Sequence, residues 1–257
     1  MHIGVFGDIH GEWRACRDAV ARIHKETPLD LVLLCGDIQP SRTTADLEFM
    51  ACPSRFRVLG DFHLFYERKE HWPVRTIAIF GNHEPYNICD ENPDGCELAP
   101  NVEFMGRVGS RTVNGLKIVG LSGTYSQRDF NEPHPAWPYS KSVSKQVAHY
   151  NDTDLDELLD LGRPDILLTH DWPLFMLEAH RDRLPRRKDV KGSKDLVSVL
   201  EGRPARWHFC GHMHFHAEQR HNRTQVIGLA AFNYDPEDAC LVLDTETGAW
   251  EWPLRNK

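Results

Sequence analysis

Five apolar runs of strand length each end in a short polar motif, and this arrangement limits the folds open to the chain more than any other feature. The motifs are GDIH (7–10), GDIQ (36–39), GNHE (81–84), THDWP (169–173) and GHMH (211–214). In α/β sheets, ligands bind where loops leave the carboxyl ends of the strands. A small glycine opens four of the motifs and allows a sharp turn and a close approach of the backbone. We therefore expect the five motifs to converge on one site.

The segments between and after these motifs predict an α/β fold. Strands are expected from the apolar runs at 2–6, 29–35, 74–80, 116–122, 164–170 and 205–210. Helical patterns lie between several of them, at 12–25, 43–51, 152–161 and 193–201, with Asp152 and Ser193 as candidate caps. The C-terminal part repeats strand and turn, which predicts antiparallel strands that complete one or two sheets. Without an internal repeat or a low-complexity linker, residues 1–257 are expected to form a single domain.

The polar side chains of the motifs make a mixed set of candidate metal ligands. They offer imidazole nitrogens and carboxyl or amide oxygens without a thiolate, which favours Mn, Fe, Zn, Co or Ni over Ca or an all-oxygen Mg site. The set is too rich for one ion and suits two. One carboxylate can bridge two ions about 3.5–4 Å apart, a spacing used for in-line displacement at phosphorus, and Asp37 is the expected bridge. The candidate ligands are Asp8, His10, Asp37, Asn82, His170, His212 and His214.

Composition narrows the class of protein only slightly. The 257 residues carry a formal net charge of −8, which argues against a general nucleic-acid coat or a membrane-surface protein. No run approaches the roughly 18 apolar residues of a membrane span, and the N-terminus lacks the pattern of a signal peptide. Seven cysteines form no CxxC pair, and Cys35 and Cys210 are expected in the core. We therefore expect an intracellular, cytoplasmic protein, and the sequence leaves its oligomeric state open.

The order GDIH, GD, GNHE, TH and GHMH, over about residues 1–215, resembles the calcineurin-like metallophosphoesterases. The resemblance implies a sandwich of two mixed β-sheets flanked by helices, and hydrolysis of phosphoesters by a hydroxide held between two divalent metal ions. It implies one ion at Asp8, His10, Asp37 and His214, and a second at Asp37, Asn82, His170 and His212.

The same resemblance assigns roles beside the ligands. His83 would contact the substrate phosphate and protonate the leaving oxygen, as general acids do. Glu84 and Asp171 would not bind metal themselves but would hold the ligand residues in position. GNHE would therefore combine a metal ligand, a proton donor and a supporting carboxylate.

Segments outside the metal motifs look like the RNA lariat debranching enzymes, which hydrolyse the 2′,5′-phosphodiester at an intron branch point. They lie at 36–66, 99–106, 116–130 and 168–173. The resemblance implies a lariat-recognition loop at about 123–150. That stretch mixes aromatic and cationic residues, which can stack bases and neutralise phosphates; we single out Tyr125, Arg128, Trp137 and Lys141. At the first motif, debranching enzymes commonly carry Cys where this chain has Asp8.

A second candidate surface for nucleic acid is the basic segment 181–194. It holds seven Arg or Lys against two Asp, which gives a local charge of +5. The segment follows the His170 motif closely. The alternative interpretation is a solvated loop.

Three functions remain open on the sequence. The first is a metal-dependent phosphodiesterase acting on branched RNA. The second is a protein Ser/Thr phosphatase or a dinucleoside-polyphosphate hydrolase, because GDIHGEW resembles their first motif, although their second motif usually reads GDxVDRG and here it is GDIQPSR. The third is a metal-binding scaffold without turnover.

Overall fold

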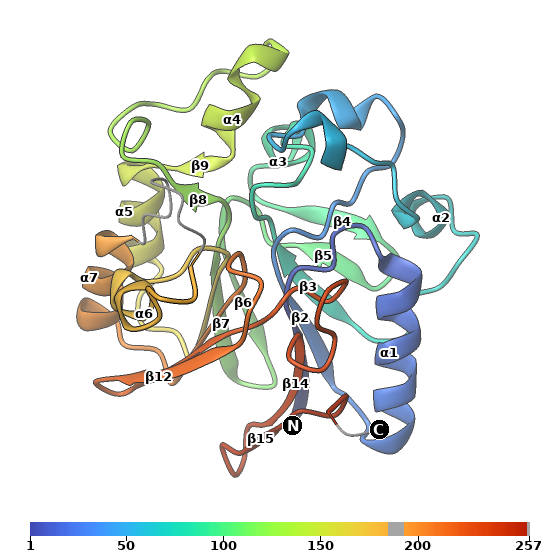
Figure 1. The fold of residues 1–257 in the computed structure, drawn as a ribbon, viewed down its shortest axis with the longest axis vertical. Helices are drawn as coiled ribbons and strands as arrows, with labels where there is room; N and C mark the ends of the chain where they lie inside the picture. The colour runs from blue at the N-terminus through green and yellow to red at the C-terminus, as the bar shows by residue number, and fades with distance from the viewer. Residues whose placement is uncertain (185–192, 256–257) are drawn as a thin grey trace.

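The computed structural model describes residues 1–184 and 193–255, in which two large mixed sheets pack face to face (Figure 1). The first sheet has the strand order β15-β14-β1-β2-β3-β5-β4. Strands β1, β2, β3 and β5 run parallel, while β14, β15 and β4 are antiparallel to their neighbours. The bounds are β1 His2–Phe6, β2 Leu31–Cys35, β3 Thr76–Ile79, β4 Cys96–Ala99, β5 Val102–Phe104, β14 Cys240–Asp244 and β15 Trp250–Glu251.

The second sheet has the order β12-β13-β11-β10-β7-β6. Its parallel centre consists of β7, β10, β11 and β13, and an antiparallel strand closes each edge. A short parallel pair, β8 Thr124–Tyr125 and β9 His149–Tyr150, stands apart. The bounds in the second sheet are β6 Val108–Val113, β7 Leu116–Leu121, β10 Ile166–Thr169, β11 Trp207–Cys210, β12 Ala217–His221 and β13 Thr224–Gly228.

Helices cover the outer face of each sheet (Figure 1). Helix α1 buries one face, including Trp13, Val20 and Ile23, against the first sheet, and α5 and α7 pack on the second. The α-helices are α1 Trp13–Glu26, α2 Phe62–Tyr66, α3 Asn87–Glu91, α4 Ser144–Val147, α5 Asp152–Asp160, α6 Leu174–Ala179 and α7 Lys194–Gly202, and the 3₁₀ helices are η1 Asp46–Phe49, η2 Ser54–Phe56 and η3 Lys141–Val143.

The space between the sheets is filled by alternate residues of the parallel strands. Ile3, Leu33 and Ile79 of the first sheet share one buried cluster with Leu168 and Phe209 of the second. Successive side chains of a strand point to opposite faces, so the other half of each strand packs beneath the helices. Burial on both faces explains why these strands are continuous apolar runs rather than alternating ones. The predicted fold class, a two-sheet mixed sandwich flanked by helices, is confirmed.

Two predictions about helices were wrong. The segment 43–51 contains only η1. The buried Asp46 side chain accepts hydrogen bonds from Arg42 and Asn87, and these bonds hold the segment in place without the backbone hydrogen bonds of an α-helix. Helix α5 is capped by Asn151 rather than Asp152; the Asn151 side chain accepts from Asp154 N at 3.0 Å. The Ser193 cap of α7 is confirmed, with Leu196 N donating to its hydroxyl at 3.0 Å.

The C-terminal strands follow the prediction in part. Strands β14 and β15 add antiparallel to the first sheet. Strand β13, however, pairs parallel with β11 and antiparallel only with β12. Strands β6 and β12 were not predicted, since both are edge strands with polar residues such as Arg111 and Glu218 in place of a continuous apolar run.

The cysteines and the helices agree with the remaining expectations. Cys35 and Cys210 are fully buried, as predicted. All seven cysteines lie in the described residues and are free thiols. Within residues 1–184 and 193–255, no helix has the length and apolar character that crossing a bilayer requires.

Candidate metal centre

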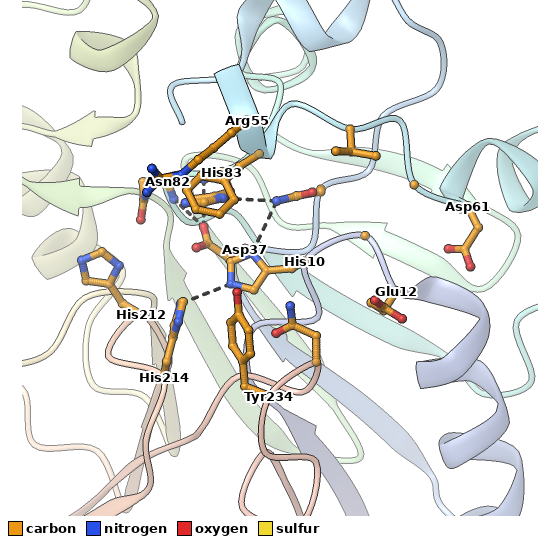
Figure 2. Close-up of a pocket in the computed structure, with 16 residues that line it drawn as sticks. His10, Glu12, Asp37, Arg55, Asp61, Asn82, His83, His212, His214 and Tyr234 are labelled. Carbon is orange, nitrogen blue, oxygen red and sulfur yellow. Dashed lines mark hydrogen bonds between the residues drawn. The ribbon is translucent and has the colours of Figure 1, made fainter. Parts of the chain in front are cut away.

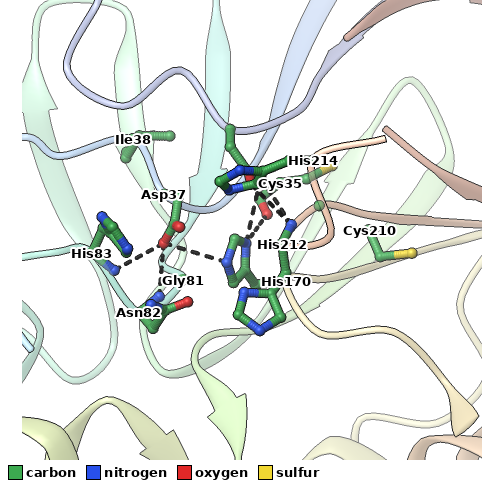
Figure 3. A network of polar contacts seen from close by, with 12 residues as sticks. Cys35, Asp37, Ile38, Gly81, Asn82, His83, His170, Cys210, His212 and His214 are labelled. Atoms are coloured by element: carbon green, nitrogen blue, oxygen red, sulfur yellow. Dashed lines mark hydrogen bonds and ion pairs between the residues drawn. The ribbon is translucent and has the colours of Figure 1, made fainter. Parts of the chain in front are cut away.

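The five polar motifs converge at the carboxyl ends of five parallel strands. The first three motifs follow β1, β2 and β3, which are neighbours in the first sheet. The other two follow β10 and β11, which are neighbours in the second. Because the two sheets pack face to face, their strand ends bring the predicted ligands to one place. Figure 3 shows five of them: Asp37, Asn82, His170, His212 and His214.

Two groups of ligand-type side chains form there, and they share one carboxylate. Within each group the ligand atoms lie within 4.8 Å of one another. Asp37 belongs to both groups, which is the arrangement that a bridging carboxylate requires. The groups are Asp8, His10, Asp37 and His214, and Asp37, His170 and His212. Asn82 adjoins the second group, because its backbone N–H donates to Asp37 Oδ1 at 2.8 Å.

Backbone N–H groups hold the carboxylates of Asp37 and Asp8 in position. Asp37 Oδ1 accepts from Asn82 N and His83 N, each at 2.8 Å. Asp8 accepts from His212 N at 3.1 Å and 3.0 Å through its two oxygens. Both carboxylates are at most 1% exposed. Each motif is therefore held against another: GNHE by the Asp of GDIQ, and GHMH by the Asp of GDIH.

Unsatisfied atoms inside this cluster show that the residues fit a divalent cation. His170 Nδ1 donates to the Cys35 carbonyl at 2.9 Å, so in the neutral ring the other nitrogen, Nε2, carries the lone pair. Among the described residues, that buried Nε2 has no hydrogen-bond partner, and neither has the buried Asn82 Oδ1. The same Nε2 lies 3.3 Å from Asp37 Oδ1. His10 Nε2 and His214 Nε2 face each other at 3.2 Å. Ring nitrogens this close share a proton in a hydrogen bond, and a bound cation can take the place of that proton.

The pKa shifts within the cluster also indicate that the site favours positive charge. Burial alone lowers the pKa of His170, but the carboxylates of Asp37 and Asp8 outweigh it and raise that pKa to about 10. Burial alone raises the pKa of Asp37, but His170 and His83 outweigh it and hold that pKa well below its usual range. The buried carboxylates thus draw positive charge into the site, which bound cations also provide.

Four of the candidate ligands have a left-handed backbone. The φ angles of His10, Asp37, His212 and His214 are 44°, 50°, 69° and 59°. Residues other than glycine rarely adopt this conformation, and where it occurs it concentrates at functional sites. The loops turn back sharply enough to aim successive side chains at the same point.

Two glycines bring the backbone within contact of these ligands. A Cβ atom on Gly81 would lie 2.3 Å from Asp37 Oδ1 and 2.5 Å from His170 Nε2. A Cβ atom on Gly211 would lie 2.1 Å from Asp8 Oδ1. Neither position can accept a side chain without displacing a ligand, which confirms the expected close approach.

Three buried aromatic side chains anchor the ligand loops. Trp13 Nε1 donates to the Ile38 carbonyl at 2.8 Å, and Tyr86 Oη donates to the Gly81 carbonyl at 2.7 Å. Trp172 Nε1 donates to the Gly211 carbonyl at 2.5 Å. Each donor comes from a helix or loop outside the strand that carries the motif. The core therefore positions the ligand loops through hydrogen bonds as well as packing.

Gln39 lies between two histidines of the site, and sequence reasoning missed it although it belongs to the GDIQ motif. Its amide nitrogen Nε2 lies 3.2 Å from His83 Nδ1 and 3.4 Å from His10 Nδ1. An amide nitrogen only donates, so His83 Nδ1 accepts from it and the ring N–H of neutral His83 is on Nε2. Nε2 of His83 is then the nitrogen available to a ligand in the pocket.

The two predicted supporting carboxylates have different surroundings. Glu84 accepts from Ile38 N at 2.5 Å and from Gly81 N at 2.7 Å, so it joins the second and third motifs from behind. Burial and the charge of Asp37 raise its pKa to about 8. Asp171 accepts from Tyr125 N at 2.8 Å and from Trp172 N at 3.0 Å, and burial raises its pKa to about 6. It joins the end of β10 to the start of segment 123–150.

A pocket of about 620 Å³ opens over the cluster (Figure 2). His83 lines it together with the candidate ligands His10, Asp37, Asn82, His212 and His214. The wall away from the strands comes from η2 and from the segment after β13, through Arg55, Phe56, Val58, Asn233 and Tyr234. None of these wall residues was predicted, because they lie in irregular segments without a motif.

The predicted substrate loop does not contribute to this pocket in the described structure. The rings of Tyr125 and Phe130 pack at 5.5 Å, and the rings of Trp137 and Phe49 pack at 5.4 Å. Arg128 is 93% exposed, 3.9 Å from Asp129. Lys141 begins η3, and its side chain lies outside what the structure describes. Contact of these four residues with substrate remains a prediction. Most of the basic segment 181–194 lies outside the described residues, at 185–192.

This chain belongs to the calcineurin-like phosphoesterase family, whose model matches residues 1–216. All five polar motifs lie within the matched part. Membership implies divalent metal ions, and the ligand groups described above fit them.

Within that family the chain is similar to curated proteins named lariat debranching enzyme. The relative from Drosophila melanogaster is 37% identical over 247 residues, which cover 90% of this chain and 46% of the relative. The relative from Schizosaccharomyces pombe is 35% identical, with 89% and 51% covered. The relative from Entamoeba histolytica is 32% identical, with 91% and 70% covered. The chain thus spans about half the length of the first two.

Solved structures share the fold at low sequence identity. A dimetal phosphatase from Danio rerio aligns with a TM-score of 0.57 at 16% identity, covering 94% of this chain and 91% of that one. A protein from Thermus thermophilus aligns with a TM-score of 0.59 at 15% identity, covering 97% and 96%. These likenesses support the architecture alone.

Proposed function

We propose that this chain is a metal-dependent phosphodiesterase that hydrolyses the 2′,5′-phosphodiester of branched RNA. The observation that carries the proposal is the pair of ligand groups that share Asp37, with His83 beside them in the same pocket. The relatives named lariat debranching enzyme support the choice of RNA.

The proposed site takes two divalent ions from among Mn, Fe, Zn, Co and Ni. Imidazole and carboxylate ligands without thiolate support that range. We also propose that residues 1–257 form one domain, since the buried cluster between the sheets joins strands from both ends of the chain. The proposed ligands are Asp8, His10, Asp37 and His214 for one ion, and Asp37, Asn82, His170 and His212 for the other.

The residues of the chain have distinct tasks in the proposed reaction. Divalent ions held by these ligands would lower the pKa of water enough to supply hydroxide at neutral pH, and would offset the charge of the phosphate oxygens. His83 delivers a proton to the departing ribose oxygen. Gln39 Nε2 donates to His83 Nδ1, which leaves the ring N–H of neutral His83 on Nε2, facing the substrate. Glu84 keeps the backbone of GDIQ and GNHE in register.

The test compares substrates with the same metal-loaded protein. We expect cleavage of a branched RNA at its 2′,5′ bond to exceed cleavage of linear 3′,5′ RNA, a phosphopeptide and a dinucleoside polyphosphate. Metal content is measured in the same preparation, and a chelator should abolish turnover. Preference for the phosphopeptide or the polyphosphate would instead indicate a protein phosphatase or a dinucleoside-polyphosphate hydrolase. Metal binding without turnover on any of these substrates would indicate a scaffold.

A further inference from the structure

The pocket wall carries aromatic and aliphatic side chains that are open to solvent. Among the described residues, the exposed large hydrophobic side chains are Val58, Tyr66 and Tyr234, at 59%, 48% and 67%. Val58 and Tyr234 both line the pocket over the metal centre, whereas Tyr66 does not. Exposed apolar side chains gathered at a concave site indicate a ligand with an apolar face.

Two aromatic rings flank the histidines of the site. The Phe56 ring lies 5.5 Å from the His83 ring, and the Tyr234 ring lies 5.8 Å from the His214 ring. Arg55 stands over Phe56 at 4.6 Å. In Figure 2, Arg55 and Tyr234 lie on opposite sides of His10 and Asp37. A ligand at the metal centre therefore has an aromatic ring and a cation on one side and a second aromatic ring on the other.

The position of Tyr234 is fixed by the backbone rather than by packing of its ring. Phe232 N donates to the Asp8 carbonyl at 2.8 Å, and Tyr234 N donates to the Ala231 carbonyl at 3.0 Å. These bonds place the turn after β13 beside the first metal motif. Tyr234 lies beyond residues 1–216 that match the family model, whereas Arg55 and Phe56 of the same wall lie within them.

Charges along the pocket restrict the ligand further. Glu12 and Asp61 line the end away from the metal cluster (Figure 2). Both oxygens of Asp61 already accept from backbone N–H groups at the start of α1, from Trp13 N at 2.8 Å and Arg14 N at 3.1 Å. The two carboxylates repel a second phosphate, and Glu12 can accept from a sugar hydroxyl or a base amino group. The pocket thus joins an anion site at the metals and Arg55 to a ring-lined space that ends in two carboxylates, and its volume of about 620 Å³ falls within the range for small-molecule sites.

We infer that this pocket binds one nucleoside attached to the scissile phosphate, with Phe56 and Tyr234 as stacking walls and Arg55 on the phosphate. The inference rests on the proposed function and names the substrate group that the site recognises. It differs from the predicted loop at 123–150, whose aromatic residues lie elsewhere. Sequence-tolerant stacking on aromatic rings is the usual way in which proteins hold unpaired bases.

The experiment uses two diesters with the same leaving group. Uridine 5′-(p-nitrophenyl phosphate) carries a nucleoside, and methyl p-nitrophenyl phosphate carries none. We expect the wild-type protein to prefer the uridine ester in kcat/KM. In Tyr234→Leu, and separately in Phe56→Leu, this preference should fall at least about tenfold, within the range for loss of one stacking contact. Tyr66→Leu is the matched control and should keep the wild-type preference.

A binding measurement separates the nucleoside site from turnover. AMP and inorganic phosphate are titrated against the metal-loaded protein by calorimetry. AMP should bind more tightly than phosphate, and Tyr234→Leu should remove most of the difference. Thermal unfolding of each variant checks that the fold is retained, which the 67% exposure of Tyr234 favours.

The outcomes distinguish the two proposals. Equal losses on both esters, or AMP binding no tighter than phosphate, would overturn the nucleoside site while leaving the phosphodiesterase in place. Failure to hydrolyse either ester would overturn the proposed function. The AMP titration alone would then decide whether the nucleoside site exists.

Discussion

At the scale of single residues, Asp37 has more functions than any other side chain of the site. It belongs to both ligand groups, accepts two backbone N–H groups and lies against His170. Asn has nearly the same shape as Asp, so replacing Asp37 with Asn removes the charge while preserving the packing.

Asp37→Asn should lose at least one bound ion and nearly all turnover while the fold remains. The substitution removes the negative charge that the two ions would share. Metal content per chain and the rate on methyl p-nitrophenyl phosphate are the measurements. Asp156→Asn, exposed on α5, is the matched control and should retain both. Full metal content with wild-type rate in Asp37→Asn would remove Asp37 from the ligand set.

His83→Ala should keep its metal ions yet slow the reaction. As a proton donor rather than a ligand, His83 is expected to contribute about 10²–10⁴-fold. The defect should be large for RNA, whose leaving ribose oxygen needs a proton, and small for a p-nitrophenyl ester, whose leaving group does not. His71→Ala, an exposed histidine away from the pocket, is the control. Loss of metal from His83→Ala would instead identify it as a ligand.

At the scale of elements, the ligand loops depend on hydrogen bonds from the surrounding core. Trp172, which follows β10, holds the Gly211 carbonyl of the motif that follows β11. The backbone of one motif thus depends on a side chain from the neighbouring motif. Sequence patterns do not reveal such pairing, since the two residues are 39 positions apart.

Trp172→Phe should weaken metal binding, and the decrease should exceed what the small loss of packing alone would cause. The change leaves the buried Gly211 carbonyl without its donor, which costs about 1–3 kcal/mol. The expected result is a lower unfolding temperature together with weaker metal binding in a competition titration. Trp252→Phe, at a ring that contacts His216 rather than a ligand loop, should affect stability without affecting metal affinity. Unchanged metal affinity in Trp172→Phe would show that the loop does not need this anchor.

The segment 123–150 tests whether an element outside the pocket contacts RNA. Replacing Arg128 and Trp137 with Ala should reduce cleavage of branched RNA well beyond cleavage of methyl p-nitrophenyl phosphate, because a small diester cannot reach the loop. Each lost base contact corresponds to about 1–3 kcal/mol. Arg128→Ala alone is the cleaner variant, since its side chain is 93% exposed and makes little contact with the fold. Equal retention on both substrates would mean that the loop does not bind RNA.

At the scale of the whole molecule, the site joins the two sheets. Asp8 and Asp37 come from the first sheet and His170 and His212 from the second, and all four meet at the carboxyl edge. Ions held there would cross-link the layers, whereas their removal leaves buried carboxylates uncompensated.

Chelation should therefore destabilise the fold. A ligand at 100 times its dissociation constant stabilises by about 2.7 kcal/mol, which for a chain of this size is roughly 5–10 °C in unfolding temperature. Calorimetry of the metal-loaded and chelated protein measures the difference. Asp37→Asn should show a much smaller shift on chelation. Identical unfolding temperatures with and without metal in the wild type would contradict the cross-link.

Local sequence pattern was sufficient to predict an α/β fold and the convergence of the five polar motifs, whereas the two-sheet sandwich was implied by the family resemblance. Continuous apolar runs specify buried strands, and parallel strands must bring their carboxyl ends to one edge, so the positions of Asp8, Asp37 and His170 follow from that pattern and one topological rule. The rest of the site depends on tertiary contacts. Gln39 and Tyr234 lie in turns and Phe56 lies in the three-residue helix η2, and contacts across the fold place all three. Sequence periodicity carries no signal for such positions. The same reason explains why 43–51 is not a helix: the Asp46 side chain accepts a hydrogen bond from Asn87, 41 positions away, and this contact outweighs local propensity.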